Sequence, residues 1–521
     1  MTVEPKRQKR PYSYYEKTIN EYSYRSMERV SKTCPEKVEA LLLRFPFDDS
    51  QDKQLRRALR RCRIYPGQGC YDDCYSAGMQ AYLYSIHRCA LMGYTNVIHG
   101  FIPVSEEELC IINSPPFQRL RNIHQLATTY LVYHGAEHTR FGHSVGVMHL
   151  TSRVFDSVTA KVPHLFSEDD DENSRKIVWY RQLLRLVGLT HDLGHAPFSH
   201  ASEELFVGGK EHEDFTKLII CETEIADYIR AIGQRFKLEY GPQYDITPEL
   251  VWMIYDGKDV TDDRFIMPDF LFLKSFMDGE LDCDKMDYLL RDSKYCGVSY
   301  GKYDLARFVS TLTAYKQDNT LQLAIERGGI QALEEFVLAR YFMFIQVYFH
   351  KTRRYLDKAL VNGLKAILPD GKYPENVEEY LKWDDVRVLH LFSESEDPAV
   401  LAFKSRKIMT CVHESKAHAE KSEKKTARLI FSLLRSEYGD RVLFDSVDKA
   451  AHKLTPFLLE PHDDSGKGIM IIDEKTCDVK NIMEESIILE SIVHPISISR
   501  IYAEKEIAPE VIAKIKEYQD S

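Results

Sequence analysis

Two adjacent residues in the first half of the chain, His191 and Asp192, have side chains that suit metal binding. A neutral imidazole beside a carboxylate favours a hard-to-borderline divalent cation. Leu184 and Val187 precede the pair at helical spacing, and His191 falls next on the same apolar stripe, so we expect it to point into the core. An isolated pair of this kind can also be a buried, hydrogen-bonded histidine beside a surface aspartate. Other histidines and carboxylates decide between the two interpretations.

Two other segments carry polar side chains at helical spacing. Arg140 and His143 are three residues apart, so they share one face of a predicted helix. Asp284, Tyr288 and Asp292 recur every four residues and line one face of another. Such a triple is often solvent-exposed, but its flanks are apolar, which favours a polar cleft over open surface.

Further imidazoles and carboxylates follow the His191-Asp192 pair closely. His195 and His200 come first, and Glu203 lies one helical turn beyond His200. The pair His212-Glu213 follows a short loop. The chain therefore concentrates titratable groups directly after the candidate metal ligands.

Two groups of cationic residues suggest contact with an anion. Residues 114–121 (SPPFQRLR) open a predicted helix and place Gln118, Arg119 and Arg121 near its N-terminal end, where an anion is favoured, although arginines are also common on helix surfaces. Arg340, Tyr348 and Lys351 share a face in or just after an aromatic-rich helix. Burying such cations among aromatic rings is unfavourable unless an anion such as phosphate binds them.

The bulk properties describe an ordinary folded protein. The chain has 521 residues, enough for two or three domains, with 44% hydrophobic and 29% charged residues. A net charge of −11 argues against a nucleic-acid coat protein. The first residues contain no apolar run, and the most apolar stretch, 336–349, is too short to cross a bilayer. The chain has 11 cysteines, and none of them show the paired spacing of a structural zinc site. We expect a cytoplasmic protein that does not bind membranes.

Changes in composition and in hydrophobic periodicity along the chain predict three segments. Residues 1–95 form a charged, tyrosine-rich helical extension with basic clusters, and residues 96–365 form a mainly helical catalytic core. Within that core the acidic run 167–174 is predicted to be a loop. Residues 366–521 form a smaller α+β lobe with strand-like runs at 468–473 and 496–503. This last segment is expected to be regulatory or oligomerising.

Six motifs of the core, FQRLRNIHQL, HTRFGHSVGV, HDLGHAPFSH, DCDKMDYLLRD, YDLARF and YFHKTRR, resemble those of the HD-domain deoxynucleoside-triphosphate triphosphohydrolases (dNTPases). They are most similar to the SAM-and-HD-domain enzymes of vertebrates and their bacterial relatives. The resemblance covers about residues 96–354, with a weaker match near Arg500, and includes no SAM-like module. It implies a mainly α fold, with an HD-domain helical core and a smaller α+β C-terminal lobe. It also implies hydrolysis of dNTPs at the α-phosphate to a deoxynucleoside and triphosphate.

The same resemblance implies a role for each matching residue. The metal ligands would be His143, His191, Asp192 and Asp284, holding Mn, Fe, Mg or Zn. The general acid would be His200, oriented by Glu203, with His195, His212, Glu213 and Arg140 near it. The triphosphate would contact Arg140, Lys285, Tyr288 and Arg340. The ribose 3′-OH would be held, and its 2′ carbon crowded, by Gln125, Leu126, Asp292 and Tyr348.

The resemblance also implies regulation by nucleotides. Positions that bind nucleotides between subunits and stabilise a tetramer are matched by Gln118, Arg121, Arg307, His350 and Lys351. Asn113 stands where an aspartate selects guanine, and an asparagine offers both an acceptor and a donor. We therefore expect a homotetramer activated by a dNTP such as dTTP rather than strictly by GTP.

Two further departures from the family pattern are Glu203 and Asn96, each replacing an aspartate. Other functions remain open: an HD-type phosphodiesterase or nucleotidase, or a nucleotide-sensing regulator gated by a protein or signal-nucleotide partner. For a dNTPase, control of dNTP pools and antiviral or antiphage defence are both compatible settings.

Overall fold

The computed structural model describes residues 93–162, 164–256, 267–317, 320–449, 468–473, 475–476, 478–492 and 494–520. The elements below belong to one compact unit, residues 94–521, with the first strand beginning one residue before it. Apart from residues 93–95, the predicted N-terminal extension with its basic clusters lies outside the described residues.

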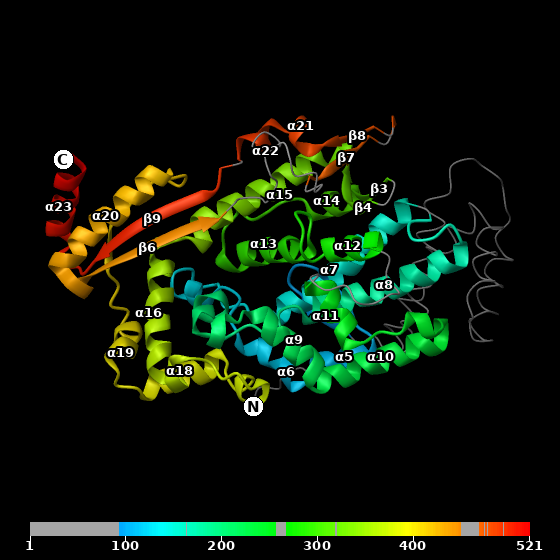
Figure 1. Cartoon of the computed structure of the whole chain (residues 1–521), viewed down its shortest axis with the longest axis horizontal. Helices are drawn as coiled ribbons and strands as arrows, with labels where there is room; N and C mark the ends of the chain where they lie inside the picture. The colour runs from blue at the N-terminus through cyan, green and yellow to red at the C-terminus, as the bar shows by residue number, and fades with distance from the viewer. Residues whose placement is uncertain are drawn as a thin grey trace, which may run out of the picture. The chain divides into compact units, whose positions relative to one another are not determined.

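Long helices form the core that carries the predicted site. The central helix α7 (Arg140–Lys161) packs against α8 (Asp170–Thr190) and α13 (Cys283–Cys296). Figure 1 shows α13 close to α7, as these contacts require. Val147, Phe155 and Leu184 at this junction are fully buried. Around it lie α5 (Glu106–Asn113), α9 (His212–Glu222), α10 (Glu224–Tyr240), α11 (Pro248–Asp256) and α12 (Met267–Ser275).

The acidic run at 167–174 is not a loop throughout, so this part of the prediction was wrong. The Asp169 carboxylate caps α8 by accepting from the Glu172 N–H at 2.8 Å, and residues 170–172 form the first turn. Acidic side chains are favourable there because they complement the helix dipole and its unpaired N–H groups. The other end of α8 confirms the apolar-stripe argument: His191 is its C-cap residue and is only 4% exposed.

A buried ion pair fixes α5 to α8. The Arg185 guanidinium donates to the Glu108 carboxylate at 2.6 and 2.7 Å. Burial alone would raise the pKa of Glu108, but the charge and hydrogen bonds of Arg185 outweigh it and lower that pKa to about 2. Removing either partner would leave an uncompensated buried charge, so this pair anchors the helix that ends at His191.

The predicted aromatic helix is interrupted. α15 (Ile330–Met343) passes into a π-helical turn (Phe344–Tyr348), and a new helix, α16 (Lys351–Ile367), begins after it. Arg340 and Tyr348 are buried, whereas Lys351 is exposed, so Lys351 does not continue their buried face. α16 also runs across the predicted boundary between residues 365 and 366.

Besides a two-stranded pair of short strands at 93–103, the described chain has two larger sheets. β3 (Leu312–Gln317), β4 (Thr320–Glu326), β7 (Met470–Ile472) and β8 (Val479–Asn481) form one in that order, in which β4 and β7 are parallel. Residues 470–472 therefore pair with a strand of the predicted core. The second sheet has the order β5 (Thr410–Glu414), β9 (Ile496–Ala503), β6 (Val442–Lys449) and is antiparallel.

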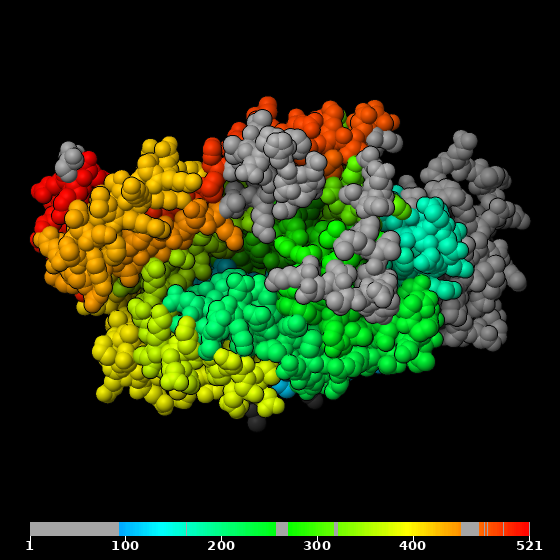
Figure 2. All heavy atoms as spheres, in the orientation of Figure 1, coloured from blue at the N-terminus to red at the C-terminus, as the bar shows by residue number. Residues whose placement is uncertain are grey.

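The C-terminal lobe is built on β9, whose residues are all buried. α20 (Lys421–Tyr438) and α23 (Ala508–Asp520) pack on this sheet around Leu434, Ile501 and Val511. Figure 2 shows the atoms of the β6 and α20 segment (orange) and of α23 (red) packed together. The predicted strands at 468–473 and 496–503 and the mainly α fold with a smaller α+β lobe are confirmed. Among the described residues, the helices include none with the length and apolar character needed to cross a membrane.

The shorter elements of the described chain include β1 (Gly93–Asn96), β2 (Gly100–Pro103), α6 (Pro115–Gln118), α14 (Leu305–Thr311), α17 (Val377–Tyr380), α18 (Asp385–Glu394), α19 (Pro398–Lys404), α21 (Ile482–Glu485), α22 (Ile487–Ser491), and the 3₁₀ turns η1 (Arg119–Asn122), η2 (Ala127–Leu131) and η3 (Ser199–Leu205).

Candidate functional site

The four predicted metal ligands converge from three helices. His143 comes from α7, His191 and Asp192 follow the end of α8, and Asp284 lies in the first turn of α13. The Nε2 atom of His143 is 2.9 Å from Asp284 Oδ1, and that of His191 is 3.3 Å from Asp192 Oδ1. Ligand atoms of His143, His191 and Asp192 all lie within 4.8 Å of one another. This is the donor set that the sequence predicts.

Hydrogen bonds on the far side of each ring fix the tautomers. His143 Nδ1 lies 2.8 Å from the Asp287 carboxylate and His191 Nδ1 lies 2.9 Å from the Gly188 carbonyl. Both partners only accept, so each ring carries its N–H on Nδ1 and turns Nε2 toward the carboxylates. His191 Nε2 is buried and has no hydrogen-bond partner among the described residues. Two nitrogen lone pairs facing carboxylates repel them unless a cation lies between, so these residues fit a divalent metal.

The raised pKa of His143 also indicates that positive charge is favourable between these carboxylates. Burial lowers this pKa, but the carboxylates of Asp284 and Asp287 outweigh burial and raise it to about 10. The imidazoles of His143 and His191 in turn hold the pKa of Asp284 far below its usual range, against the effect of burial. A divalent metal would supply the charge that a proton supplies at His143 otherwise.

Asp287 supports the metal site from behind and was not predicted from the sequence. It is fully buried; besides His143, it accepts from Arg291 at 2.7 and 2.9 Å and lies 2.6 Å from His99 Nε2. A β-carbon on Gly146 would lie 2.3 Å from Asp287 Oδ1, so a glycine allows this close approach. The spacing of Asp287 and Arg291, four residues apart on α13, is the sequence signal that could have identified this pair.

A strained turn presents His200. Phe198 and Ser199 have φ values of 58° and 55°, in the left-handed region that residues other than glycine rarely adopt. The Phe198 N–H donates to Asp385 Oδ1 at 2.7 Å, and the Ser199 hydroxyl donates to the His124 carbonyl at 2.7 Å. Asp385 lies 187 residues further along the chain, so local sequence gave no signal for it.

The predicted acid–base residues form one cluster around Glu203. Its Oε1 atom lies 2.8 Å from His200 Nδ1 and 2.7 Å from His212 Nδ1, and the His195 ring stacks on that of His212 at 3.9 Å. The His200 side chain is 63% exposed. A β-carbon on Gly194 would lie 2.0 Å from the His212 carbonyl, so a side chain there would push α9 away. One donor atom from each of the four titratable residues lies within 4.8 Å of the others, so this group could also hold a cation.

The charges in this cluster differ from residue to residue. Burial and the positive charge of Arg140 hold the pKa of His195 well below its usual range, so this ring is neutral. Burial would raise the pKa of Glu203, but hydrogen bonds from His200 and His212 outweigh it and lower the pKa strongly. Glu213 Oε2 lies 3.2 Å from His212 Nδ1. An ionised Glu203 therefore sits between two imidazoles.

Arg140 links the metal site to the strained turn. Its guanidinium donates to Asp192 Oδ2 at 2.6 Å and to the Ser199 hydroxyl at 2.8 Å. Both hydrogen bonds lie in the interior, since Arg140 is only 3% exposed. This position brings a permanent positive charge next to the metal ligands.

The other predicted triphosphate contacts lie beside Asp284. Lys285 is paired with the Asp282 carboxylate, and burial raises the pKa of Tyr288 to about 12. The charge of Arg340, on α15, acts on the pKa of both Lys285 and Tyr288, so the three side chains are neighbours. Together they offer two cations and one neutral hydroxyl.

The predicted sugar contacts come from three segments. The Tyr348 hydroxyl donates to Asp292 Oδ2 at 2.7 Å, joining the π-helical turn to α13. Gln125 and Leu126 are buried just before η2, and Gln125 Oε1 has no hydrogen-bond partner among the described residues. The Leu126 backbone leads into Ala127, which is left-handed with φ 50°.

The six predicted activator contacts do not form one buried cluster within the described chain. Asn113 ends α5, and near it Gln118 accepts from Arg121 at 2.8 Å. Arg307, on α14, donates to the Gly328 carbonyl, while His350 and Lys351 begin α16. The side chains of Arg121, Arg307 and Lys351 are exposed in the single chain.

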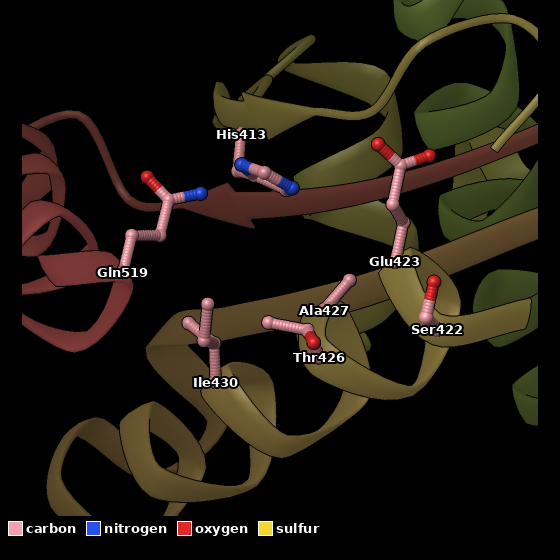
Figure 3. A pocket seen from close by; sticks show the side chains of 7 residues that line it. All are labelled: His413, Ser422, Glu423, Thr426, Ala427, Ile430 and Gln519. Atoms are coloured by element: carbon pink, nitrogen blue, oxygen red, sulfur yellow. The ribbon is translucent and has the colours of Figure 1, made fainter. Parts of the chain in front are cut away.

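A separate small pocket lies in the C-terminal lobe (Figure 3). His413 of β5, Gln519 of α23 and residues 422–430 of α20 enclose about 220 Å³. It contains none of the metal ligands or acid–base residues. The chemistry of the metal site therefore does not involve this pocket.

Two family models match the chain. The HD domain matches residues 140–251, which contain three of the four candidate metal ligands, and the HD associated region matches residues 303–409. The second match begins beside α14 and ends before β5, so it includes α15, the π-helical turn and α16.

Two relatives and one structure illustrate the similarity. The uncharacterized protein YwfO of Bacillus subtilis is 30% identical over 421 residues, which are 77% of this chain and 88% of that protein. The Dictyostelium discoideum protein named deoxynucleoside triphosphate triphosphohydrolase SAMHD1 homolog is 30% identical over 60% of this chain and 57% of its own length.

A crystal structure of a hypothetical protein from Aquifex aeolicus superimposes with a TM-score of 0.63 at 29% identity, covering 82% of this chain and all of that chain. The HD-domain match coincides with the convergence of His143, His191 and Asp192, and the match to YwfO extends over most of both proteins. The chain therefore belongs to the HD-domain family of metal-dependent phosphohydrolases.

Proposed function

We propose that this protein hydrolyses dNTPs at the α-phosphate, releasing a deoxynucleoside and triphosphate. One observation carries the proposal: α13 contributes to the metal, cation and sugar parts of the site in the order a dNTP requires. Asp284 belongs to the metal site, Tyr288 lies beside the cations, and Asp292 bonds Tyr348 next to the sugar-contact residues. These positions are spaced by about 6 Å along the helix axis, four residues at a time.

In this mechanism His143, His191, Asp192 and Asp284 would hold a divalent metal that polarises the phosphate and activates water. Arg140, Lys285 and Arg340 would balance the charge of the triphosphate. Water adds to the α-phosphorus and the bond to the 5′-oxygen breaks. His200 gives its proton to that oxygen, and the ionised Glu203, 2.8 Å from Nδ1, orients the ring.

Product analysis tests the reaction class. The purified chain, incubated with Mn²⁺ and mixed dNTPs, is expected to release inorganic triphosphate and deoxynucleosides. Release of monophosphates, or hydrolysis of cyclic dinucleotides in place of dNTPs, would indicate an HD phosphodiesterase or nucleotidase. Binding of nucleotides without turnover would indicate a regulator gated by a partner. A dNTPase of this kind would lower dNTP pools, in pool control or in antiviral defence.

Ribonucleotides are expected to be poor substrates. A 2′-hydroxyl placed against buried Leu126 would be both a steric clash and an unpaired polar group, at a cost of about a few kcal/mol, or about tenfold to 100-fold in kcat/KM. The comparison is CTP with dCTP and GTP with dGTP at equal concentration. Leu126→Ala should reduce the difference in kcat/KM between each ribonucleotide and its deoxynucleotide. Equal hydrolysis of the two by the parent protein would contradict the sugar-pocket assignment.

We further propose a homotetramer that requires a nucleotide activator. Exposed Arg121, Arg307 and Lys351 could bind its phosphates where subunits meet, and Asn113 favours a dNTP such as dTTP. The measurement pairs each dNTP substrate with each candidate activator and follows the mass by sedimentation. We expect activation and tetramer formation to coincide. Exclusive activation by GTP would contradict the Asn113 argument, and full activity of a nucleotide-free monomer would rule out the regulatory site.

A further inference from the structure

His138 joins the two halves of the proposed sugar pocket although it belongs to neither. Its Nε2 atom lies 2.8 Å from Asp292 Oδ1, and its backbone carbonyl accepts from the Gln125 N–H at 3.0 Å. The residue is 6% exposed, and its ring stacks on Tyr295 with centroids 4.6 Å apart. One residue thus contacts Asp292 through its side chain and Gln125 through its main chain.

The backbone of His138 is itself held by a short antiparallel ladder of hydrogen bonds to residues 123–125. The Arg140 N–H donates to the Ile123 carbonyl at 3.0 Å, and His124 and Thr139 form a β-bridge between these two hydrogen bonds. The segment ends at Thr139, the N-cap of α7. Any shift of His138 would therefore disturb the Gln125 segment and the start of the helix that carries His143.

The hydrogen bonds to Asp292 determine how it can meet a substrate. Oδ1 accepts from His138 Nε2, since a carboxylate cannot donate, and Oδ2 accepts from the Tyr348 hydroxyl. Each oxygen has a second lone pair, so the carboxylate can still accept from a substrate hydroxyl. Asp292 is 1% exposed, and without His138 an unpaired lone pair would remain in the interior or the side chain would rotate.

We propose that His138 is a positioning residue for sugar recognition: it holds Asp292 as the acceptor for the substrate's 3′-hydroxyl and keeps Gln125 beside it. This inference rests on the proposed dNTPase function and extends it to a residue outside the predicted contacts. The site then selects for a 3′-hydroxyl through a residue that need not touch the substrate.

Two substitutions separate the hydrogen bond from the ring. In His138→Gln the side-chain amide can reach the place of Nε2 and donate, but the stacking on Tyr295 is lost. In His138→Phe the aromatic ring is kept and the donor is lost. Melting temperature and metal content of both variants are measured first, so that a misfolded variant is recognised before kinetics.

The readout is kcat/KM for a dNTP and for the 2′,3′-dideoxynucleotide of the same base. For the parent we expect the dNTP to be preferred by about tenfold or more, because a site built to bond a hydroxyl rejects an analogue that lacks it. His138→Phe should lower kcat/KM for the dNTP by about tenfold and change that for the dideoxynucleotide by less than about twofold. His138→Gln should retain most of the preference.

Each other outcome has a distinct meaning. Equal losses on both substrates with His138→Phe would overturn the positioning role and leave a structural one. Loss of the preference in His138→Gln, with the preference retained in His138→Phe, would show that the ring and not the donor matters, and would also overturn the proposal. A parent that releases triphosphate equally from both substrates would refute the inference but not the dNTPase function. A parent that releases none would refute the function itself.

Discussion

Alanine at both His191 and Asp192 is expected to abolish hydrolysis, with a loss of about 10⁴-fold or more, and to remove the bound metal. The two side chains supply one imidazole and one carboxylate of the four-residue donor set, and their donor atoms are 3.3 Å apart. A remaining pair, His143 and Asp284, cannot hold a divalent cation in an open catalytic geometry. The metal held by these residues is the group that the proposed mechanism uses to polarise the phosphate and to activate water.

The measurement combines metal content by mass spectrometry with kcat/KM at saturating Mn²⁺. The matched control is His390→Ala with Glu394→Ala, which removes an exposed histidine–carboxylate pair from α18. Because the Asp192 change leaves buried Arg140 without that partner, His191→Gln with Asp192→Asn serves as a second variant that preserves size. Activity within about tenfold of the parent after rigorous chelation would rule out a metal-dependent mechanism.

Part of the candidate metal site could be seen in the sequence because its signal is local. An adjacent His-Asp pair at the end of an apolar stripe and helical spacing at Arg140–His143 and Asp284–Asp292 each concern a few neighbouring residues. The assignment of these residues to one metal site came from the resemblance to the HD-domain family. Helix periodicity then decides which side chains face inward. The same local information predicted the strands at 468–473 and 496–503.

The supporting residues could not be predicted because tertiary contacts determine them. Asp385 bonds the backbone of Phe198 across 187 residues, and His99 meets Asp287 across 188. The left-handed turn at Phe198-Ser199 depends on such contacts, since neither residue favours that conformation by itself. The acidic run at 167–174 was misread for a different reason: its charge resembles that of a loop, but it caps a helix.

The interruption after α15 shows a further limit of periodicity. Arg340, Tyr348 and Lys351 would share a face only on a continuous helix, and the π-helical turn changes the spacing between them.

Replacing His200 by alanine is expected to lower kcat by about 10² to 10⁴-fold while the affinity for dNTP is nearly retained. A positioned general acid contributes a factor of this size. The His200 side chain is 63% exposed, and Glu203 is its hydrogen-bond partner in the described chain. Its removal therefore costs little folding stability, and a rate effect can be read without a stability correction.

The leaving group distinguishes an acid from a structural residue. From a p-nitrophenyl phosphate ester the p-nitrophenolate ion leaves without needing a proton, so His200→Ala should affect hydrolysis of this ester far less than that of a dNTP. The matched variant is Glu203→Gln, which removes the charge that orients the His200 ring at 2.8 Å but leaves the imidazole in place. We expect it to lose less activity than His200→Ala and in the same substrate-dependent way.

The pH profile of kcat adds an independent check. If His200 delivers the proton, the pH profile of kcat should differ between the parent and His200→Ala, because the proton donor to the leaving group has been removed. Collapse of dNTP binding with turnover of bound substrate retained would instead make His200 a substrate ligand. The acid would then be sought at His212, because burial and Arg140 keep neighbouring His195 neutral, whereas Glu203 raises the pKa of His212 against the effect of burial.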